Sequence, residues 1–239
     1  MRDWLHLLGP SATSNNPPKW FERDDGDARI ARDRSLIAPK YPGLRYALNF
    51  RIQKVVLQGH ITLAEEVTRI PTRIRTRIVF PDDYPDIEPT ASDDGDHFPH
   101  IADRHFYKNG VCCLWIPVDS QWNKDNADAL LPFIDQVAVF FERQLIYDAA
   151  GIWTWGERGH GDKGYIEFLE ERFGAGYDSI EPFIPIILES SWVDAKARCP
   201  CGNGSRYSLC HKETVDAVKA GIRRHRDTGI LRLLKAANA

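Results

Sequence analysis

TRIRTRIVFPDDYPDIEP, residues 72–89, carries the clearest structural pattern of the chain. Its first half alternates strictly, with Ile74, Ile78 and Phe80 on one side and arginines between them, which is typical of a half-buried β-strand. Three prolines follow within residues 80–89, and they exclude a regular ladder and impose a rigid, extended chain. The sequence therefore predicts a strand that ends at a proline-rich turn.

The residues around this strand predict an α+β fold. Two stretches upstream, RYALNFRIQ (45–53) and VVLQGHITL (55–63), are rich in β-branched and aromatic residues. Their close succession favours an antiparallel β-meander with one face on the core. Helices are expected over residues 19–34, 126–147 and 165–174, the second because its apolar residues recur at helical spacing.

Length and composition limit the domain organisation. The chain has 239 residues, 43% of them hydrophobic, which suffices for one sizeable core and a small appendage. We expect a loose lead-in over residues 1–18, a main domain over 19–190 and a C-terminal element over 191–239. The start of the chain does not resemble a signal peptide, and its most apolar stretch is too short to span a bilayer. We expect a cytoplasmic protein without a membrane partner.

Charge and cysteines both set the C-terminal element apart. Residues 198–239 hold nine Lys/Arg and three Asp/Glu, a net charge of +6, whereas the preceding residues carry −9. Such a basic tail is either a solvated helix or a surface with its own partner. The five cysteines form a pair, Cys112 and Cys113, and a C-terminal trio. In a reducing compartment, such clusters indicate metal binding or thiol chemistry rather than disulfides.

CPCGNGSRYSLCH, residues 199–211, is the most specific motif in the chain. It supplies the four ligands that a closed structural zinc site needs, namely Cys199, Cys201, Cys210 and His211. The motif resembles SEC-C, although Asn203 replaces the usual serine. This resemblance implies a structural Zn²⁺ in a small zinc knuckle, and contacts with ribosome, nascent-chain or chaperone surfaces. A basic helix over residues 220–235 would suit an acidic partner; a stabilising cap or a dimerisation element is the alternative.

A second resemblance covers roughly residues 19–150. FPDDYPDIEP (80–89), RHFYKNGVCCLW (104–115), Trp122 and a long helix follow one another as in the ubiquitin-conjugating enzymes. Reading Gly-x-x-Cys-Leu from Gly110 leads to Cys113. The resemblance implies that Cys113 carries a ubiquitin-like modifier as a thioester, and that Cys112 is a small buried side chain.

Two histidines are candidates for the same site. The family has an asparagine at the oxyanion eight residues before its cysteine, and here that position is His105. A histidine can donate from a ring nitrogen or act as a general base; the alternative is that His105 only holds the loop. WGERGHG (155–161) resembles a segment of prokaryotic members, which makes His160 the second candidate, with a flexible loop tip as the alternative.

The predicted function is that of a bacterial ubiquitin-like protein conjugating enzyme. The resemblance implies three partners: a ubiquitin-like modifier, an activating enzyme and a protein target. It also implies a setting in anti-phage defence. One alternative is a binding module, with the same fold and an idle cysteine, that acts as an adaptor. Another is a Cys-His thiol hydrolase that uses Cys113 with His105 or His160; the sequence has no helix start directly after Cys113 to lower its pKa.

Overall fold

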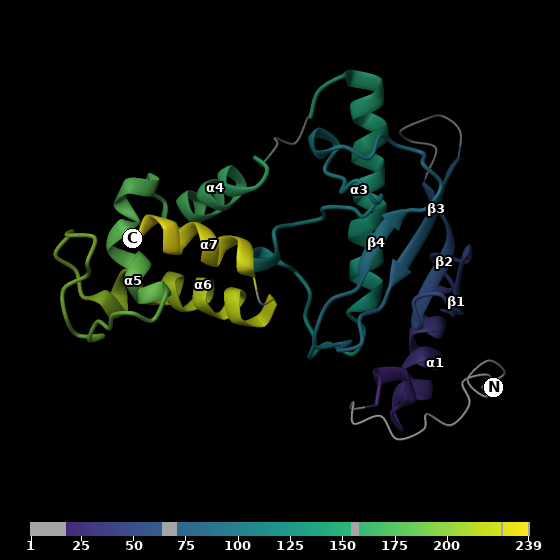
Figure 1. Ribbon diagram of the computed structural model, residues 1–239, viewed down its shortest axis with the longest axis horizontal. Helices are drawn as coiled ribbons and strands as arrows, with labels where there is room; N and C mark the ends of the chain where they lie inside the picture. Colours follow the sequence, from purple (N-terminus) through teal and green to yellow (C-terminus); the bar gives the residue numbers. More distant parts are fainter. Residues whose placement is uncertain (1–17, 64–70, 154–157, 226, 239) are drawn as a thin grey trace. The chain divides into compact units, whose positions relative to one another are not determined.

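A computed structural model describes residues 18–63, 71–153, 158–225 and 227–238 (Figure 1). The chain divides into two compact units. The first unit comprises residues 1–114 and 122–154, and the second comprises 115–121 and 155–239. The boundary predicted after residue 190 therefore falls inside the second unit. The predicted lead-in lies outside the described residues, apart from Pro18.

The first unit is built on a four-stranded antiparallel sheet in the order β1-β2-β3-β4. The strands are β1 (Leu44–Asn49), β2 (Lys54–Leu63), β3 (Thr72–Val79) and β4 (Thr90–Asp93). Ile61 pairs with Ile74 and Leu57 with Ile78, and all four side chains are fully buried. The predicted meander is confirmed, but β4 lies in a segment for which the sequence predicts no regular structure.

Two helices complete the first unit, α1 (Gly26–Ile37) and α3 (Leu130–Ala150). The apolar face of α3 lies on the sheet and buries Ile134, Val137 and Phe141 (Figure 1). The helix starts at Leu130, later than the predicted residue 126. It is ended by the next residue after Ala150, Gly151, which adopts a left-handed conformation. The predicted helix over 19–34 is only partly correct, because Trp20–Glu22 forms a separate 3-10 turn. The α+β class is confirmed.

The second unit is helical and has its own hydrophobic core. Its helices are α4 (Asp162–Phe173), α5 (Ile184–Ile187), α6 (Lys212–His225) and α7 (Thr228–Ala237). Short 3-10 helices of the second unit lie at Pro117–Asp119, Tyr177–Ser179, Glu181–Phe183 and Tyr207–Leu209, and those of the first unit lie at Trp20–Glu22 and Ala102–Arg104. The prediction of a single basic helix over 220–235 is wrong, because α6 ends at His225 and a new helix, capped by Asp227, begins at Thr228. No helix among the described residues is long and apolar enough to cross a bilayer.

Asp227 explains why a new helix begins at Thr228. Its carboxylate caps α7 by accepting hydrogen bonds from the backbone N–H groups of Gly229 and Ile230. It also accepts the Tyr165 hydroxyl at 2.7 Å and the backbone N–H of Val118 at 3.0 Å. Asp227 is only 3% exposed, so this one carboxylate joins α4, α7 and the 115–121 segment inside the second unit.

Asp227→Ala should lower the free energy of unfolding by about 3 kcal/mol, because it removes a helix cap and leaves a buried N–H unsatisfied. The matched control is Asp162→Ala, which removes a half-exposed ion pair with Arg232 in the same unit and should cost less than about 1 kcal/mol. Chemical denaturation of the full chain measures both values. Equal losses in the two variants would contradict the role assigned to Asp227.

Candidate functional site

The predicted nucleophile lies in a segment that we call the cysteine loop, residues 94–114. Its last part pairs with the free edge of β4: Cys112 N–H donates to the Ala91 carbonyl at 2.8 Å, and Asp93 N–H donates to the Gly110 carbonyl at 3.0 Å. An exposed strand edge presents unpaired backbone groups, and this pairing satisfies them. The position of the loop backbone is therefore set by the sheet.

The two neighbouring cysteines have different environments. Cys112 is 7% exposed and packs into the core, whereas Cys113 is only partly buried. Successive side chains of an extended segment point to opposite faces, so the pairing with β4 separates the two thiols. The interpretation of Cys112 as a small buried side chain agrees with this burial. Access from solvent favours Cys113 as the reactive thiol.

Burial raises the pKa of both thiols. For Cys112 the pKa is strongly raised, first by burial and then by the nearby negative charge of Asp93. Burial also raises the pKa of Cys113, and a hydrogen bond with the Tyr107 side chain lowers it in part. At neutral pH Cys113 is therefore mainly a thiol, which does not match the lowered pKa of a hydrolase nucleophile.

His105 lies directly beside Cys113 in the backbone pairing. Its carbonyl accepts the Cys113 N–H at 2.8 Å. The residue adopts a left-handed conformation, with φ 54° and ψ 36°, which few non-glycine residues do. Its ring makes an edge contact with Trp153, with 5.3 Å between centroids. The structure thus brings the backbone of His105 to Cys113, and the role of the ring stays a prediction.

His160 belongs to the second unit, whereas Cys113 belongs to the first. It is exposed and lies two residues before the start of α4. Residues 155–157 of the WGERGHG segment lie outside the described residues. The proposed part of His160 in the thiol chemistry therefore stays a prediction.

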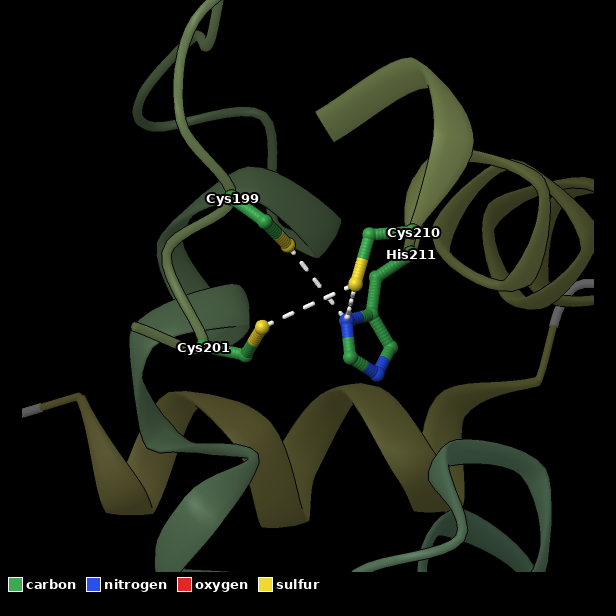
Figure 2. Close-up of side chains that lie close together, drawn as sticks. All are labelled: Cys199, Cys201, Cys210 and His211. Atoms are coloured by element: carbon green, nitrogen blue, oxygen red, sulfur yellow. Dashed lines mark hydrogen bonds between the residues drawn. The ribbon is translucent and has the colours of Figure 1, made fainter. Parts of the chain in front are cut away.

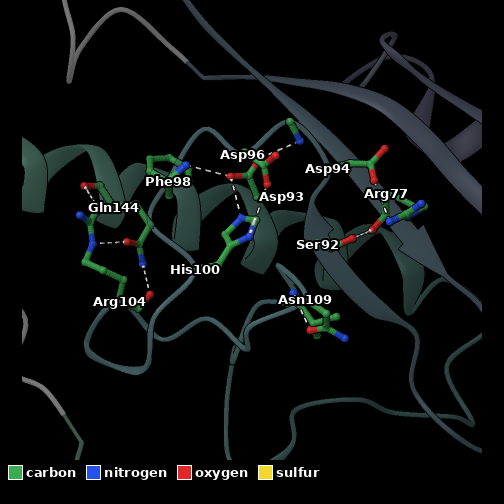
Figure 3. Close-up of polar contacts among 12 residues, drawn as sticks. Arg77, Ser92, Asp93, Asp94, Asp96, Phe98, His100, Arg104, Asn109 and Gln144 are labelled. Carbon is green, nitrogen blue, oxygen red and sulfur yellow. Dashed lines mark hydrogen bonds and ion pairs between the residues drawn. The ribbon is translucent and has the colours of Figure 1, made fainter.

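A buried carboxylate, Asp93, binds backbone and side-chain groups of the cysteine loop (Figure 3). It accepts hydrogen bonds from the N–H groups of Gly95 and Phe98, and lies 3.3 Å from His100 Nε2. His100 in turn packs against Gly110, where a Cβ atom would lie 2.7 Å from the ring. Gly110 also has φ +78°. Both the lack of space for a Cβ atom and this left-handed backbone require a glycine at this position of the Gly-x-x-Cys spacing. His100 therefore links Asp93 to the Gly110 turn of the cysteine loop.

The sequence gives little indication of a second buried group, formed by Arg104 and Gln144 (Figure 3). Arg104 is 6% exposed, and its Nε donates to Gln144 Oε1 at 2.8 Å. Gln144 is fully buried and its amide donates back to the Arg104 carbonyl at 2.9 Å. Only a glutamine on the apolar face of a predicted helix could have drawn attention to this pair.

Cys199, Cys201, Cys210 and His211 form the second candidate site, within the second unit (Figure 2). Their ligand atoms all lie within 4.8 Å of one another. Cys201 Sγ is 3.7 Å from Cys210 Sγ, and Cys199 Sγ is 3.4 Å from His211 Nδ1. These four side chains can hold a metal ion.

The local backbone explains how the four side chains converge. Gly202 and Gly204 both have positive φ, as the predicted tight turn requires. Asn203 donates its side-chain amide to Cys210 Sγ at 3.1 Å, and its backbone lowers the pKa of Cys201. Both contacts stabilise thiolates, the form that binds a metal.

The cluster is not an isolated knuckle. The His211 ring packs against both Phe173 and Phe183, with centroid distances of 5.6 and 4.9 Å. Cys199 and Tyr207 belong to the same buried core as α4 and α6. Residues outside the motif therefore supply the hydrophobic core against which the cluster packs.

Part of the C-terminal positive charge is paired within the second unit. Lys219 and Arg223 both contact the Glu189 carboxylate, and Arg232 contacts Asp162. These pairs lie at the surface and contribute little to stability. They do reduce the positive charge available to an acidic partner.

No protein-family model matches the chain, and no curated protein matches it either. The functional interpretation of both sites therefore depends on their residues and geometry.

Alkylation should distinguish the two neighbouring thiols. Cys113 is expected to react with iodoacetamide with a pH midpoint above the ordinary thiol value of about 8.5, because burial disfavours its thiolate. Tyr107→Phe should raise that midpoint further, because it removes the group that stabilises the thiolate. Cys112 should stay protected in both proteins. Peptide mass spectrometry measures each site, and equal rates at the two cysteines would contradict the assignment.

Proposed function

We propose that the chain is a conjugating enzyme that carries a ubiquitin-like protein as a thioester on Cys113 and transfers it to a protein target. The observation that carries the proposal is the environment of Cys113. Its thiol is partly accessible, its neighbour Cys112 is buried, and its N–H is bound by the residue eight positions earlier. The order of the meander, the proline-rich turn and the long helix supports the same proposal.

Loading of Cys113 is a thioester exchange. The Cys113 sulfur attacks the carbonyl carbon that joins the modifier to the activating enzyme's cysteine. A new C–S bond forms to Cys113, the old C–S bond breaks, and the proton lost from Cys113 replaces the acyl group on the departing thiol. The raised pKa of Cys113 makes its thiolate more nucleophilic, whereas a smaller fraction of the thiol is ionised at neutral pH.

Discharge of the thioester needs an acceptor nucleophile, such as a lysine amine. The amine attacks the thioester carbonyl, an amide bond forms, and Cys113 leaves as a thiolate that takes up a proton. A thiolate of raised pKa leaves more slowly, so the thioester persists until an acceptor is in place. His105 is the residue whose ring we propose to act on the oxyanion or on the attacking nucleophile.

Two other functions receive less support from the geometry. A Cys-His hydrolase needs a thiolate at neutral pH, and burial acts in the opposite direction on Cys113. An adaptor with an idle cysteine needs no accessible thiol. The partly accessible Cys113 therefore favours the conjugating enzyme over both.

We further propose that the metal held by the second unit is a structural Zn²⁺. In a tetrahedron with zinc–sulfur bonds of about 2.3 Å, neighbouring sulfurs lie about 3.8 Å apart. The 3.7 Å between Cys201 and Cys210 fits this spacing. Three cysteines and one histidine fill all four positions, so a bound zinc would stabilise the fold and would not hold a reactive water.

The first prediction from this function concerns thioester formation. With ATP, a cognate activating enzyme and its modifier, the protein should form an adduct that reducing agent removes. Cys112→Ala should retain the adduct and Cys113→Ala should lose it, while Cys113→Ser should give a stable, alkali-labile ester. Non-reducing gels give the measurement.

His105→Ala serves in the same gels as a test of the discharge step. It should form the thioester and discharge it more slowly, because the ring acts after loading. If an active activating enzyme is present and no adduct forms on the wild-type protein, the adaptor function replaces the proposed one.

Zinc binding is tested without any activity. The purified protein should contain about one zinc per chain, and Cys210→Ala should lose it and unfold at lower temperature, because the remaining ligands leave the site open. Cys112→Ala, a cysteine substitution outside the cluster, should keep the metal. Because thiols must lose protons to bind zinc, the metal should dissociate as the pH falls. Elemental analysis and thermal unfolding measure both effects.

An unchanged metal content in Cys210→Ala would contradict the assigned ligand set. A full complement of a different metal would retain the site and overturn the proposal of zinc.

A further inference from the structure

The cysteine loop contains an arginine that is almost entirely buried. Every nitrogen of the Arg104 guanidinium has a partner in the first unit: Nε binds Gln144 Oε1 at 2.8 Å, Nη2 binds the Gln144 carbonyl at 3.2 Å, and Nη1 lies 2.7 Å from Asp148 Oδ1. The guanidinium also stacks over the Tyr147 ring, 4.5 Å from its centroid. All of these partners belong to the last two turns of α3.

Gln144 stands at a position where an apolar residue is expected. It follows Ile134, Val137 and Phe141 on one face of α3, and like them it is fully buried. A buried amide is costly unless both of its ends are hydrogen-bonded. Its oxygen accepts from the Arg104 guanidinium, and its nitrogen donates to the Arg104 backbone carbonyl at 2.9 Å.

The bond to the backbone is the one that reaches the reactive thiol. The Arg104 carbonyl belongs to the peptide unit that leads into His105, the residue held in the left-handed conformation. From this conformation the His105 carbonyl points to the Cys113 N–H and accepts it at 2.8 Å. Left-handed backbone is unfavourable for a non-glycine residue and persists only where its surroundings hold it in place.

We infer that Gln144 is a positioning residue for Cys113: its amide holds the Arg104 carbonyl, keeps His105 left-handed, and thereby fixes the backbone on which Cys113 is presented. The role in catalysis rests on the proposed conjugating function, whereas the role in placing the thiol does not. Arg104 contributes by satisfying the amide oxygen, so that the nitrogen of Gln144 stays turned toward the backbone.

Gln144→Glu isolates the critical bond. The glutamate keeps the size of the side chain and an acceptor for the guanidinium, but it loses the N–H that donates to the Arg104 carbonyl. Gln144→Met is the second variant, because it removes the same donor without adding a charge. Asp148→Asn is the matched control. Asp148 is another partner of Arg104, and its side chain is 47% exposed. The substitution leaves the bond from Gln144 to the Arg104 carbonyl in place.

The primary measurement is alkylation of the two neighbouring cysteines in the full chain, without modifier or activating enzyme. In both Gln144 variants Cys113 should react faster than in the wild type, and its pH midpoint should fall toward the ordinary thiol value of about 8.5, because a released loop is better solvated. Cys112 should stay protected, since the pairing with β4 remains. Asp148→Asn should match the wild type at both cysteines.

The second measurement is discharge of a preformed thioester in a single turnover. Despite the more accessible thiol, discharge in the Gln144 variants should slow by about tenfold, because a displaced reacting group loses rate steeply. If the wild type forms no thioester, the proposed function fails, and alkylation still decides whether Gln144 positions Cys113.

Two results would overturn the inference. One is that Cys113 is alkylated in both Gln144 variants at the same rate and with the same pH midpoint as in the wild type. That result would show that the bond to the Arg104 carbonyl does not place the thiol. The other is an equal acceleration at Cys112 and Cys113 in both variants, which would show that Gln144 stabilises the core as a whole and does not position the loop.

Discussion

The outer edge of β4 pairs with the cysteine loop, and this pairing determines the position of Cys113. The segment Gly110–Cys112 pairs with Ala91 and Asp93, so the loop leaves the edge with one cysteine turned inward and the next turned outward. The accessibility of Cys113 and the bond from its N–H to His105 both follow from this pairing. Gly110 and the buried Asp93 carboxylate make the close approach of the loop to the strand possible.

Most of the sheet could be predicted because the stretches that form β1 and β2 are rich in β-branched and aromatic residues and β3 alternates between apolar and polar residues. The burial pattern of β3 follows the alternation of Ile74 and Ile78 with arginines. β4 has only four residues, TASD, three of them buried, so neither its length nor its periodicity distinguishes it from a loop. The new helix that begins after Asp227 was not predicted either. The Asp227 carboxylate accepts hydrogen bonds from Tyr165 and Val118, which are far away in the sequence.

The candidate sites show the same division between local and distant information. The four metal ligands lie within thirteen consecutive residues, and the glycines between them have the backbone angles that the motif requires. The spacing from Gly110 selects Cys113 over Cys112 only through the family resemblance. Gln144 lies 40 residues from Arg104, and its meaning appears only when α3 and the cysteine loop are packed together. Short-range spacing can therefore indicate candidate ligands and a candidate nucleophile, but not the groups that support them.

The division of the chain into two units has a further consequence for how such a protein can arise and be divided. The chain passes from one unit to the other three times, after residues 114, 121 and 154. The short segment 115–121 directly follows the candidate nucleophile and its leucine, and it is held by Asp227 and Arg172 of the second unit. A single recombination or cleavage event cannot separate the units intact, because each of them consists of two pieces of sequence. The two units are therefore expected to be inherited together, as one gene segment.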